Sequence, residues 1–345
     1  MPDPKTPAAR AADIAAFLDA AGWGGARRTP LPCDASFRSY HRIADGGRTA
    51  MLMDAPPPLE NVRPFARLTR HLGALGFSTP QILAEDPEAG FLLLEDFGDR
   101  TYTRLLAGGA DERTLYDLAL DVLIALHRIE PARAVPADLP AYDDNALLAE
   151  AFLLTDWYMP AMLGRPTAPD VRQAYAEAWL SVFPVVRAQP RTLVLRDYHV
   201  DNLMVLDGRD GVAACGLLDF QDALAGPAAY DLMSLVEDAR RDIDPALASR
   251  LLERYEAAFP GKGRSAFGDA FSVVAAQRHA KVIGIFTRLW RRDGKPNYLG
   301  HIPRVWRLLE RALQKPVLAP VANWFDEHIP PERRGKPAPL PEGAA

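Results

Sequence analysis

The chain has 345 residues, 48% of them hydrophobic, which is enough for two lobes that each have a core. A formal net charge of −5 argues against general binding to nucleic acid, and no apolar run of about 18 residues is present to span a membrane. Cys33 and Cys215 lie far apart and outside any metal-binding pattern, and no secretory signal is visible at the start. We therefore expect a cytoplasmic protein with small-molecule partners, and neither nucleic acid nor a membrane among them.

The first part of the chain alternates helix and strand patterns. Apolar residues at helical spacing predict a helix over 14–21 that ends at Gly22. Two strand-like runs, 37–43 and 49–53, flank Asp45-Gly46-Gly47 and predict a hairpin.

A second helix and two further strands follow the hairpin. An apolar stripe after three prolines predicts a helix over 59–75. The runs 80–83 and 91–94 read as strands, and the second ends at Glu95-Asp96-Phe97-Gly98. Glu60 is read as a residue of the first helical turn, although pairing with a phosphate-binding arginine is the alternative.

From about residue 100 the pattern is helical. Amphipathic helices are predicted around 115–126 and 171–182, and two more within 278–311, separated by Gly294-Lys295-Pro296-Asn297. The proline-rich tail, 331–345, is expected to be disordered.

One stretch carries the chemistry. The apolar runs 193–195 and 203–206 flank a loop with Asp197 and Asn202, and a return run, 212–218, delivers Asp219-Phe220. The turn at Asp207-Gly208 predicts a hairpin between the last two runs. We expect this arrangement to bring Asp197, Asn202 and Asp219 close together.

Those three side chains suit phosphoryl transfer from a nucleotide. One carboxylate would orient or deprotonate the attacking hydroxyl, while a carboxylate and an amide would hold magnesium, which prefers oxygen ligands. Asp-x-x-x-x-Asn alone is a common pattern, but a following hairpin and Asp-Phe is the spacing of a kinase catalytic loop. The alternative is that Asp197 and Asn202 are ordinary turn residues bonded to their own backbone.

The chain resembles the aminoglycoside-phosphotransferase-like kinases, whose catalytic loop runs roughly H-G-D-x-H-x-x-N. Here Asp197, His199 and Asn202 match, Leu195-Arg196 replaces the leading His-Gly, and Leu218-Asp219-Phe220, Gly226 and Asp231-Leu232 match the downstream pattern. The similarity covers about residues 10 to 330. Within the family it is greatest to bacterial anomeric kinases, which phosphorylate C1 of N-acetylmuramate and N-acetylglucosamine in cell-wall (peptidoglycan) recycling, on the phrases 34–38, 53–57, 94–98 and 196–199.

This resemblance implies an α+β, protein-kinase-like bilobal fold: a small antiparallel sheet lobe over 1–98 and a mainly helical lobe over 99–330. It implies ATP and Mg²⁺ as cofactors, Asp197 as the catalytic carboxylate, and Asn202 and Asp219 as metal ligands. Asp231 opens a helix-like run, 231–235, so we expect it to hold the loop backbone rather than the substrate. The expected nucleotide contacts are Ser36, Phe37, Arg38, Arg42, Glu95 and Phe97, and the expected acceptor contacts are Tyr198, Arg278 and His279.

One departure from the kinase pattern concerns the phosphate-binding lysine. Lysine is absent from residue 6 to residue 261, and the second arm of the first hairpin reads Ala50-Met51-Leu52-Met53-Asp54. Arg38 or Arg42 is expected to replace it, with Arg48 nearby, because arginine can grip phosphate with two parallel hydrogen bonds. The alternative is a non-catalytic protein that binds nucleotide poorly.

The late helices give the clue to the acceptor. Residues 278–311 contain nine Lys or Arg and only two acids, Asp293 and Glu310. A basic segment favours a neutral or anionic acceptor over a polycationic aminoglycoside. A solvated basic face is the competing interpretation, and choline, homoserine or an aminoglycoside remain alternative acceptors.

Overall fold

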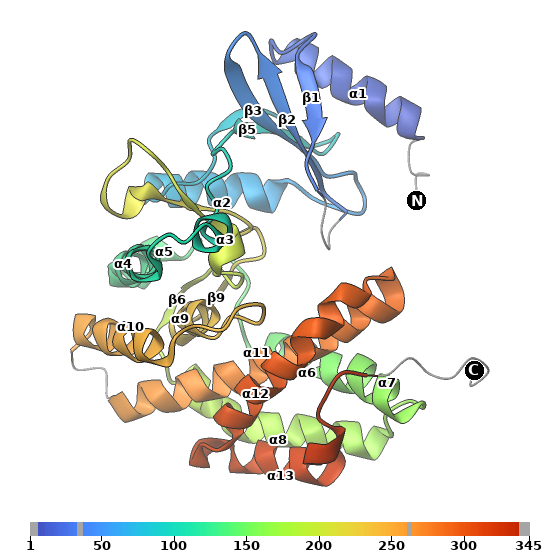
Figure 1. Cartoon of the computed structure of the whole chain (residues 1–345), viewed down its shortest axis with the longest axis vertical. Helices are drawn as coiled ribbons and strands as arrows, with labels where there is room; N and C mark the ends of the chain where they lie inside the picture. The colour runs from blue at the N-terminus through green and yellow to red at the C-terminus, as the bar shows by residue number, and fades with distance from the viewer. Residues whose placement is uncertain (1–5, 33–36, 261–263, 338–345) are drawn as a thin grey trace. The chain divides into compact units, whose positions relative to one another are not determined.

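The computed structural model describes residues 6–32, 37–260 and 264–337, which form two compact units (Figure 1). The first unit contains the chain up to Val122 together with Val200–Asp222, and the second contains Leu123–His199 and the chain from Ala223 onward. This grouping differs from a division at residue 98, because residues 99–122 and 200–222 group with the sheet.

The first unit is built on an antiparallel sheet with the strand order β1-β2-β3-β5-β4. The five-stranded sheet confirms the expected small sheet lobe. β1 has no counterpart among the expected strands, because its four residues are all exposed and show no apolar alternation. The strands are β1 (Arg27–Pro30), β2 (Ser39–Asp45), β3 (Arg48–Asp54), β4 (Ile82–Asp86) and β5 (Phe91–Glu95).

The β2–β3 hairpin follows the sequence prediction. Asp45 pairs with Arg48 across a two-residue turn. Gly46 and Gly47 have φ of 53° and 89°, the left-handed values that a tight hairpin turn of this type requires at both positions. Helix α1 (Pro7–Ala20) packs beside this sheet, and its Ile14 and Leu18 belong to the same buried cluster as residues of β2, β3 and β5 (Figure 1).

Helix α2 (Arg63–Ala74) begins four residues later than expected. The backbone N–H groups of Leu59 and Glu60 both donate to the carbonyl of Pro56, so this segment forms a turn before the helix starts. The expected apolar stripe is buried. Its Phe65 stacks on Phe220, with the ring centroids 5.0 Å apart, which fixes the start of the segment after Asp219 against the helix.

The second expected hairpin is also present in the first unit. β7 (Leu203–Val205) pairs antiparallel with β8 (Cys215–Leu217). The return run is shorter than predicted, because Gly211–Ala214 forms a 3-10 turn in place of strand. α3 (Tyr102–Ala107) and the first part of α4 (Glu112–Arg128) complete this unit.

The second unit is helical and is organised around the 30-residue helix α11, which packs against α6, α8, α9 and α12. Its helices are α5 (Pro131–Ala134), α6 (Asp144–Leu153), α7 (Met159–Leu163), α8 (Pro169–Arg187), α9 (Ala229–Val236), α10 (Pro245–Ala258), α11 (Arg264–Asp293), α12 (Ile302–Leu313) and α13 (Ala319–His328). A short pair, β6 (Arg191–Val194) and β9 (Leu224–Pro227), frames the segment that leads to Asp197.

The tail after α13 is ordered further than its composition suggests. Pro331–Arg333 forms a 3-10 turn, and the backbone N–H of Gly335 donates to the Tyr158 hydroxyl at 3.1 Å. The Arg334 guanidinium ion-pairs with Asp326 and Glu310. The expectation of disorder from residue 331 is therefore wrong for 331–337, while 338–345 lie outside the described residues. No helix in the described part of the chain is both long and apolar enough to cross a membrane.

A glycine on α11 sets how closely the helices of the second unit approach. A Cβ at Gly284 would lie 2.2 Å from the backbone carbon of Leu153, at the end of α6. A Cβ at Gly268, on the same helix, would meet nothing within 4 Å.

We therefore predict opposite effects for two matched substitutions. Gly284→Ala should lower stability by about 1–3 kcal/mol, because the backbone of α6 must move to admit the methyl group. Gly268→Ala should raise stability by up to about 1 kcal/mol through helix propensity alone. Thermal and denaturant unfolding of both variants tests this; equal effects would contradict the close approach.

Candidate active site

Asn202 and Asp219 lie together in the first unit. The Nδ2 atom of Asn202 is 3.5 Å from Oδ2 of Asp219, and the carbonyl of Asn202 accepts the N–H of Leu218 at 3.0 Å. The β7–β8 hairpin places the two residues at the neighbouring ends of its strands. The structure thus brings together the two residues that the sequence assigned to a metal.

Asp219 is fixed by a side chain that the sequence reading missed. The Nε2 of Gln221 donates to Oδ1 of Asp219 at 2.8 Å. Asp219 also has a left-handed backbone, with φ of 57°, which aspartate tolerates better than most residues do. Such a conformation in a non-glycine residue is often found at functional sites.

A cavity of about 380 Å³ opens beside this pair, within the first unit. Its walls combine strands of the sheet with the β7–β8 hairpin: Tyr40, Met51, Leu94, Met204 and Leu218 supply apolar surface. The charged and polar lining comes from Arg42, Glu95, Asp96, Asp99, Thr101, Arg104, Asn202 and Asp219. Apolar surface combined with polar groups is the usual lining of a small-ligand site, and the size of this cavity can accept a nucleotide base and sugar.

The donor set fits magnesium. A carboxylate and an amide at this spacing match an ion that takes one or two protein ligands and completes its shell with phosphate oxygens and water. The side chain of Asp219 is 41% exposed, so phosphates can reach it. Rotating the Asn202 amide by 180° would present Oδ1 to an ion in place of Nδ2. The described residues contain no group of three or more His, Cys, Asp or Glu side chains that could hold a metal ion by themselves.

The three candidate arginines have different surroundings. Arg38 lies with its NH2 atom 3.5 Å from Oδ1 of Asp219. Arg42 ion-pairs with Asp96 at 2.8 Å and Asp99 at 2.9 Å, and donates to the carbonyl of Gly98 at 3.0 Å. These hydrogen bonds, above all the one to Asp99, raise the pKa of Arg42. Arg48 pairs at 2.7 Å with Asp45, on the hairpin turn.

The exit from β5 lines the cavity through Glu95 and Phe97. The N–H of Glu95 donates to the carbonyl of Gln81 at 2.8 Å, and its carboxylate pairs with Arg209. Phe97 packs so closely on Gly216 that a Cβ there would lie 2.9 Å from its ring. Phe37 is 65% exposed, and Ser36 lies outside the described residues.

Asp197 belongs to the second unit, because the chain passes between the units after His199. Its loop is anchored by Asp231, whose carboxylate accepts the N–H of Leu195 at 2.6 Å and of Arg196 at 2.8 Å. This confirms the expected backbone-holding role. Burial raises the pKa of Asp231 to about 7, and the two N–H donors oppose that change. Arg196 has φ of 70°, a left-handed value that is unusual for arginine.

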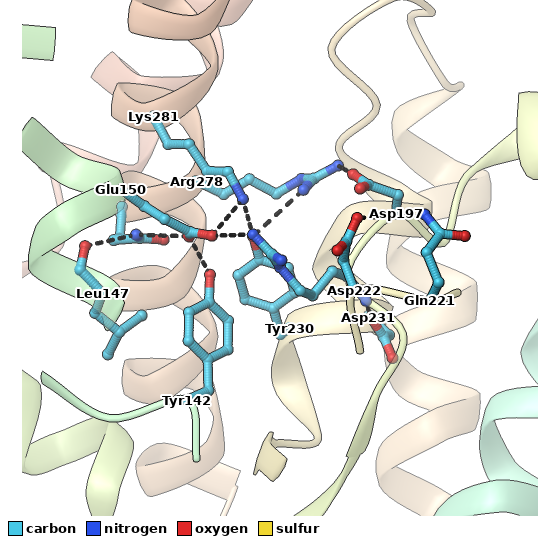
Figure 2. Close-up of polar contacts among 12 residues, drawn as sticks. Tyr142, Leu147, Glu150, Asp197, Gln221, Asp222, Tyr230, Asp231, Arg278 and Lys281 are labelled. Atoms are coloured by element: carbon cyan, nitrogen blue, oxygen red, sulfur yellow. Dashed lines mark hydrogen bonds and ion pairs between the residues drawn. The ribbon is translucent and has the colours of Figure 1, made fainter. Parts of the chain in front are cut away.

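A buried charge network surrounds Asp197, and Figure 2 shows its members. The Arg278 guanidinium is 3.5 Å from Oδ1 of Asp197 and donates to the Tyr230 hydroxyl at 3.3 Å. Lys281, one turn along α11, contacts Glu150 at 2.7 Å. Glu150 also pairs with Arg196 and accepts from the Tyr142 hydroxyl.

These cations keep Asp197 ionised. Burial alone would raise its pKa, but the charges of Arg278, Lys281, His199 and Arg196 outweigh it and hold the pKa well below the ordinary value. His199 itself has a lowered pKa, chiefly because it is buried.

Two expected acceptor contacts are placed in the protein interior. His279 is 1% exposed, and its Nε2 is 2.6 Å from Oε2 of Glu237. Tyr198 is 2% exposed. Arg278, the third expected contact, is also buried, and its guanidinium reaches the carboxylate of Asp197.

Much of the basic segment 278–311 is also paired. Carboxylates from outside the segment reach into it: Glu150 to Lys281, Asp242 to Arg304 and Arg307, and Glu237 to Arg311. Counting charges within the segment missed these partners, because they come from distant parts of the sequence. Glu150 in particular had no motif to mark it.

Comparisons with known proteins identify the family of the chain. A model of the phosphotransferase enzyme family matches residues 27–267. A protein of Caulobacter vibrioides named N-acetylmuramate/N-acetylglucosamine kinase is 37% identical, over 94% of this chain and 98% of the relative. A protein of the same name from Pseudomonas aeruginosa is 40% identical, over 94% and 93%.

Solved structures show the same fold at low sequence identity. Choline kinase LicA from Streptococcus pneumoniae has a TM-score of 0.61 at 12% identity, covering 90% of this chain and 99% of that one. ADP-bound aminoglycoside phosphotransferase APH(2'')-Ib has a TM-score of 0.58 at 16% identity, covering 89% and 99%. The fold is therefore the expected α+β, protein-kinase-like one. The chain belongs to the phosphotransferase enzyme family and is an enzyme that transfers phosphate to a hydroxyl acceptor.

Proposed function

We propose that the protein transfers the γ-phosphoryl group of ATP to the C1 hydroxyl of N-acetylmuramate or N-acetylglucosamine, in the recycling of cell-wall sugars in the cytoplasm. The proposal that the protein binds ATP rests on the Asn202–Asp219 pair beside a partly apolar cavity. The names of the 35–40% identical relatives support the amino-sugar acceptor.

The residues of the first unit would hold the nucleotide. The adenine would lie between the apolar walls of the cavity, with its edge toward the chain at Glu95–Phe97. Asn202 and Asp219 would hold Mg²⁺ against the phosphates. Bound Mg²⁺ would neutralise charge on the phosphate oxygens.

Asp197 would act on the acceptor. The C1 oxygen forms a bond to the γ-phosphorus while the bond from that phosphorus to the bridging oxygen breaks and ADP leaves; the C1 hydroxyl proton passes to the carboxylate of Asp197. This role requires Asp197 to be ionised, which the surrounding cations ensure. It also requires the two units to bring Asp197, Asn202 and Asp219 around one ATP molecule.

The charges at Asp197 favour a neutral or anionic acceptor. Arg278 lies at the carboxylate, and Lys281 and Arg196 lie behind it, paired with Glu150. A polycationic aminoglycoside would meet like charge here, whereas the lactyl carboxylate of N-acetylmuramate would meet Arg278.

Glu150 offsets part of the positive charge of this cluster. It is 13% exposed and contacts both Arg196 and Lys281, which would otherwise be two buried cations with Asp197 as their main counter-charge. Its pKa is affected most by burial, which raises it, but the two cations reverse this and leave it lowered.

The first prediction concerns Asp197. Asp197→Asn keeps the size of the side chain but removes its ability to accept a proton, so kcat should fall about 10²–10⁴-fold. ATP binding should change little. The unfolding midpoint should fall, because buried Arg278 loses a charged partner, but circular dichroism should still report a folded protein at the assay temperature, which separates loss of chemistry from loss of fold. Near-wild-type turnover in this variant would remove Asp197 from the mechanism.

The second prediction concerns the acceptor. N-acetylmuramate and N-acetylglucosamine should yield ADP and a sugar phosphate that mild acid hydrolyses, as expected of phosphate at C1. Kanamycin, choline and homoserine should yield ADP no faster than water does. Preferred turnover of any of these three would replace the proposed acceptor.

The third prediction is a pH dependence of stability. The pKa of Glu150 is lower in the folded protein than in the unfolded chain. Its ionised form therefore stabilises the folded state above about pH 4.5, and this stabilisation is lost as the pH falls through the pKa of the folded protein. Glu150→Gln should cost about 3–5 kcal/mol at pH 7, and the deficit should shrink below about pH 4.5. If the loss of stability in Glu150→Gln is the same at every pH, the charge of Glu150 does not stabilise the folded protein.

A further inference from the structure

We propose that Arg38 supplies the cation that contacts the ATP phosphates in place of the missing lysine, and that Glu60 positions it. This deepens the proposed function at the same nucleotide site. In kinases of this fold the lysine lies on the strand that corresponds to β3, where this chain has Met51 and Met53.

Arg38 lies near a residue that is proposed to hold the metal. It directly precedes β2, and its NH2 atom is 3.5 Å from Oδ1 of Asp219, the carboxylate proposed to hold Mg²⁺. Phosphates bridged by that ion would therefore come within reach of the guanidinium. The Arg38 side chain is 14% exposed, so it is partly removed from water, where a charge-assisted hydrogen bond is stronger.

The other arginines around the cavity are each held by shorter ion pairs. Arg42 bridges Asp96, Asp99 and the carbonyl of Gly98, and so ties β2 to the turn after β5. Arg104 pairs with Asp99 at 2.9 Å. Arg209 pairs with Glu95 and donates to Ser78 at 2.9 Å. The ion pairs of Arg38 with Asp219 and Glu60, at 3.5 and 3.9 Å, are longer than these, so a phosphate would replace them at a smaller cost.

Glu60 holds the segment that carries Arg38. Its Oε1 accepts the backbone N–H of Phe37 at 3.2 Å, and its Oε2 is 3.9 Å from Nε of Arg38. The early turn at Pro56 keeps Glu60 out of helix α2 and lets it face the start of β2. The expectation that Glu60 belongs to the first helical turn is therefore wrong, and the pairing with an arginine holds.

A second cavity supports a ligand at this point. A space of about 240 Å³ is lined by Arg38, Glu60 and Gln221, within the first unit. The Oε1 atom of this Gln221 is buried and has no hydrogen-bond partner in the described structure, while its Nε2 holds Asp219. A buried amide oxygen of this kind calls for a donor, and a water on the metal or between phosphate and protein would supply one.

The test is a calorimetric titration of ATP, ADP and adenosine with Mg²⁺ and without acceptor. Arg38→Ala should weaken ATP and ADP about 10–100-fold, the range for one charge-assisted hydrogen bond, and leave adenosine unchanged. Arg38→Lys should recover part of the loss. Arg48→Ala is the matched control, because it removes an equal charge at the hairpin turn and should leave all three affinities unchanged.

Glu60→Gln tests the positioning role. It should weaken ATP in the wild-type background and have no further effect in the Arg38→Ala background, because Glu60 acts through Arg38. Additive losses would overturn the positioning role, and unchanged ATP affinity in Arg38→Ala would overturn the proposal. A loss that is equal for adenosine would also overturn it, since it would mean a structural effect.

The titration contains no acceptor, so it does not depend on which alcohol is phosphorylated. If wild-type protein binds ATP but transfers nothing to amino sugars, the acceptor proposal fails and the Arg38 result still stands. If wild-type protein binds no ATP, both proposals fail.

Discussion

The function that we propose requires several carboxylates to stay ionised while a highly negative nucleotide binds beside them. In that proposal Asp219 holds a metal and Asp197 accepts a proton, so both side chains must remain charged. Like charges at this density need cations placed among them. The chain supplies those cations as arginines throughout the first unit, and as arginine with one lysine at Asp197.

Each unit has its own cations beside its carboxylate. In the first unit, Arg38 lies at Asp219 while Arg42 is committed to the turn after β5. In the second, Arg278 faces Asp197, and Glu150 offsets the two cations behind it. Arg196, which directly precedes Asp197, and Asp219 itself both have left-handed backbone conformations. Their strain persists because Asp231 holds one loop and Gln221 the other.

Local patterns in the sequence predicted much of this. The glycine pair between β2 and β3, the hairpin before Asp219 and the anchoring role of Asp231 all rest on short-range signals, and the structure contains all three. The start of α2 was misplaced because prolines at 56–58 allow a turn that periodicity cannot show. Glu150 and the partners of the basic segment could not be predicted, since each acts on residues far away in the sequence and no motif marks it. Gln221 lies only two residues from Asp219, but no motif marks it either. Tyr198 and His279 were expected at the acceptor from their positions in the sequence, and both side chains are buried.

Binding of Mn²⁺ in place of Mg²⁺, followed by electron paramagnetic resonance with a non-hydrolysable ATP analogue, tests the central claim most directly. Asp219→Asn and Asn202→Ala should each weaken the ternary Mn²⁺ complex, because both residues are proposed ligands. Asp197→Asn should leave it intact, because Asp197 is proposed to serve the acceptor and not the ion. Mn²⁺ affinity that is unchanged in Asp219→Asn, or lost in Asp197→Asn, would contradict this division of roles.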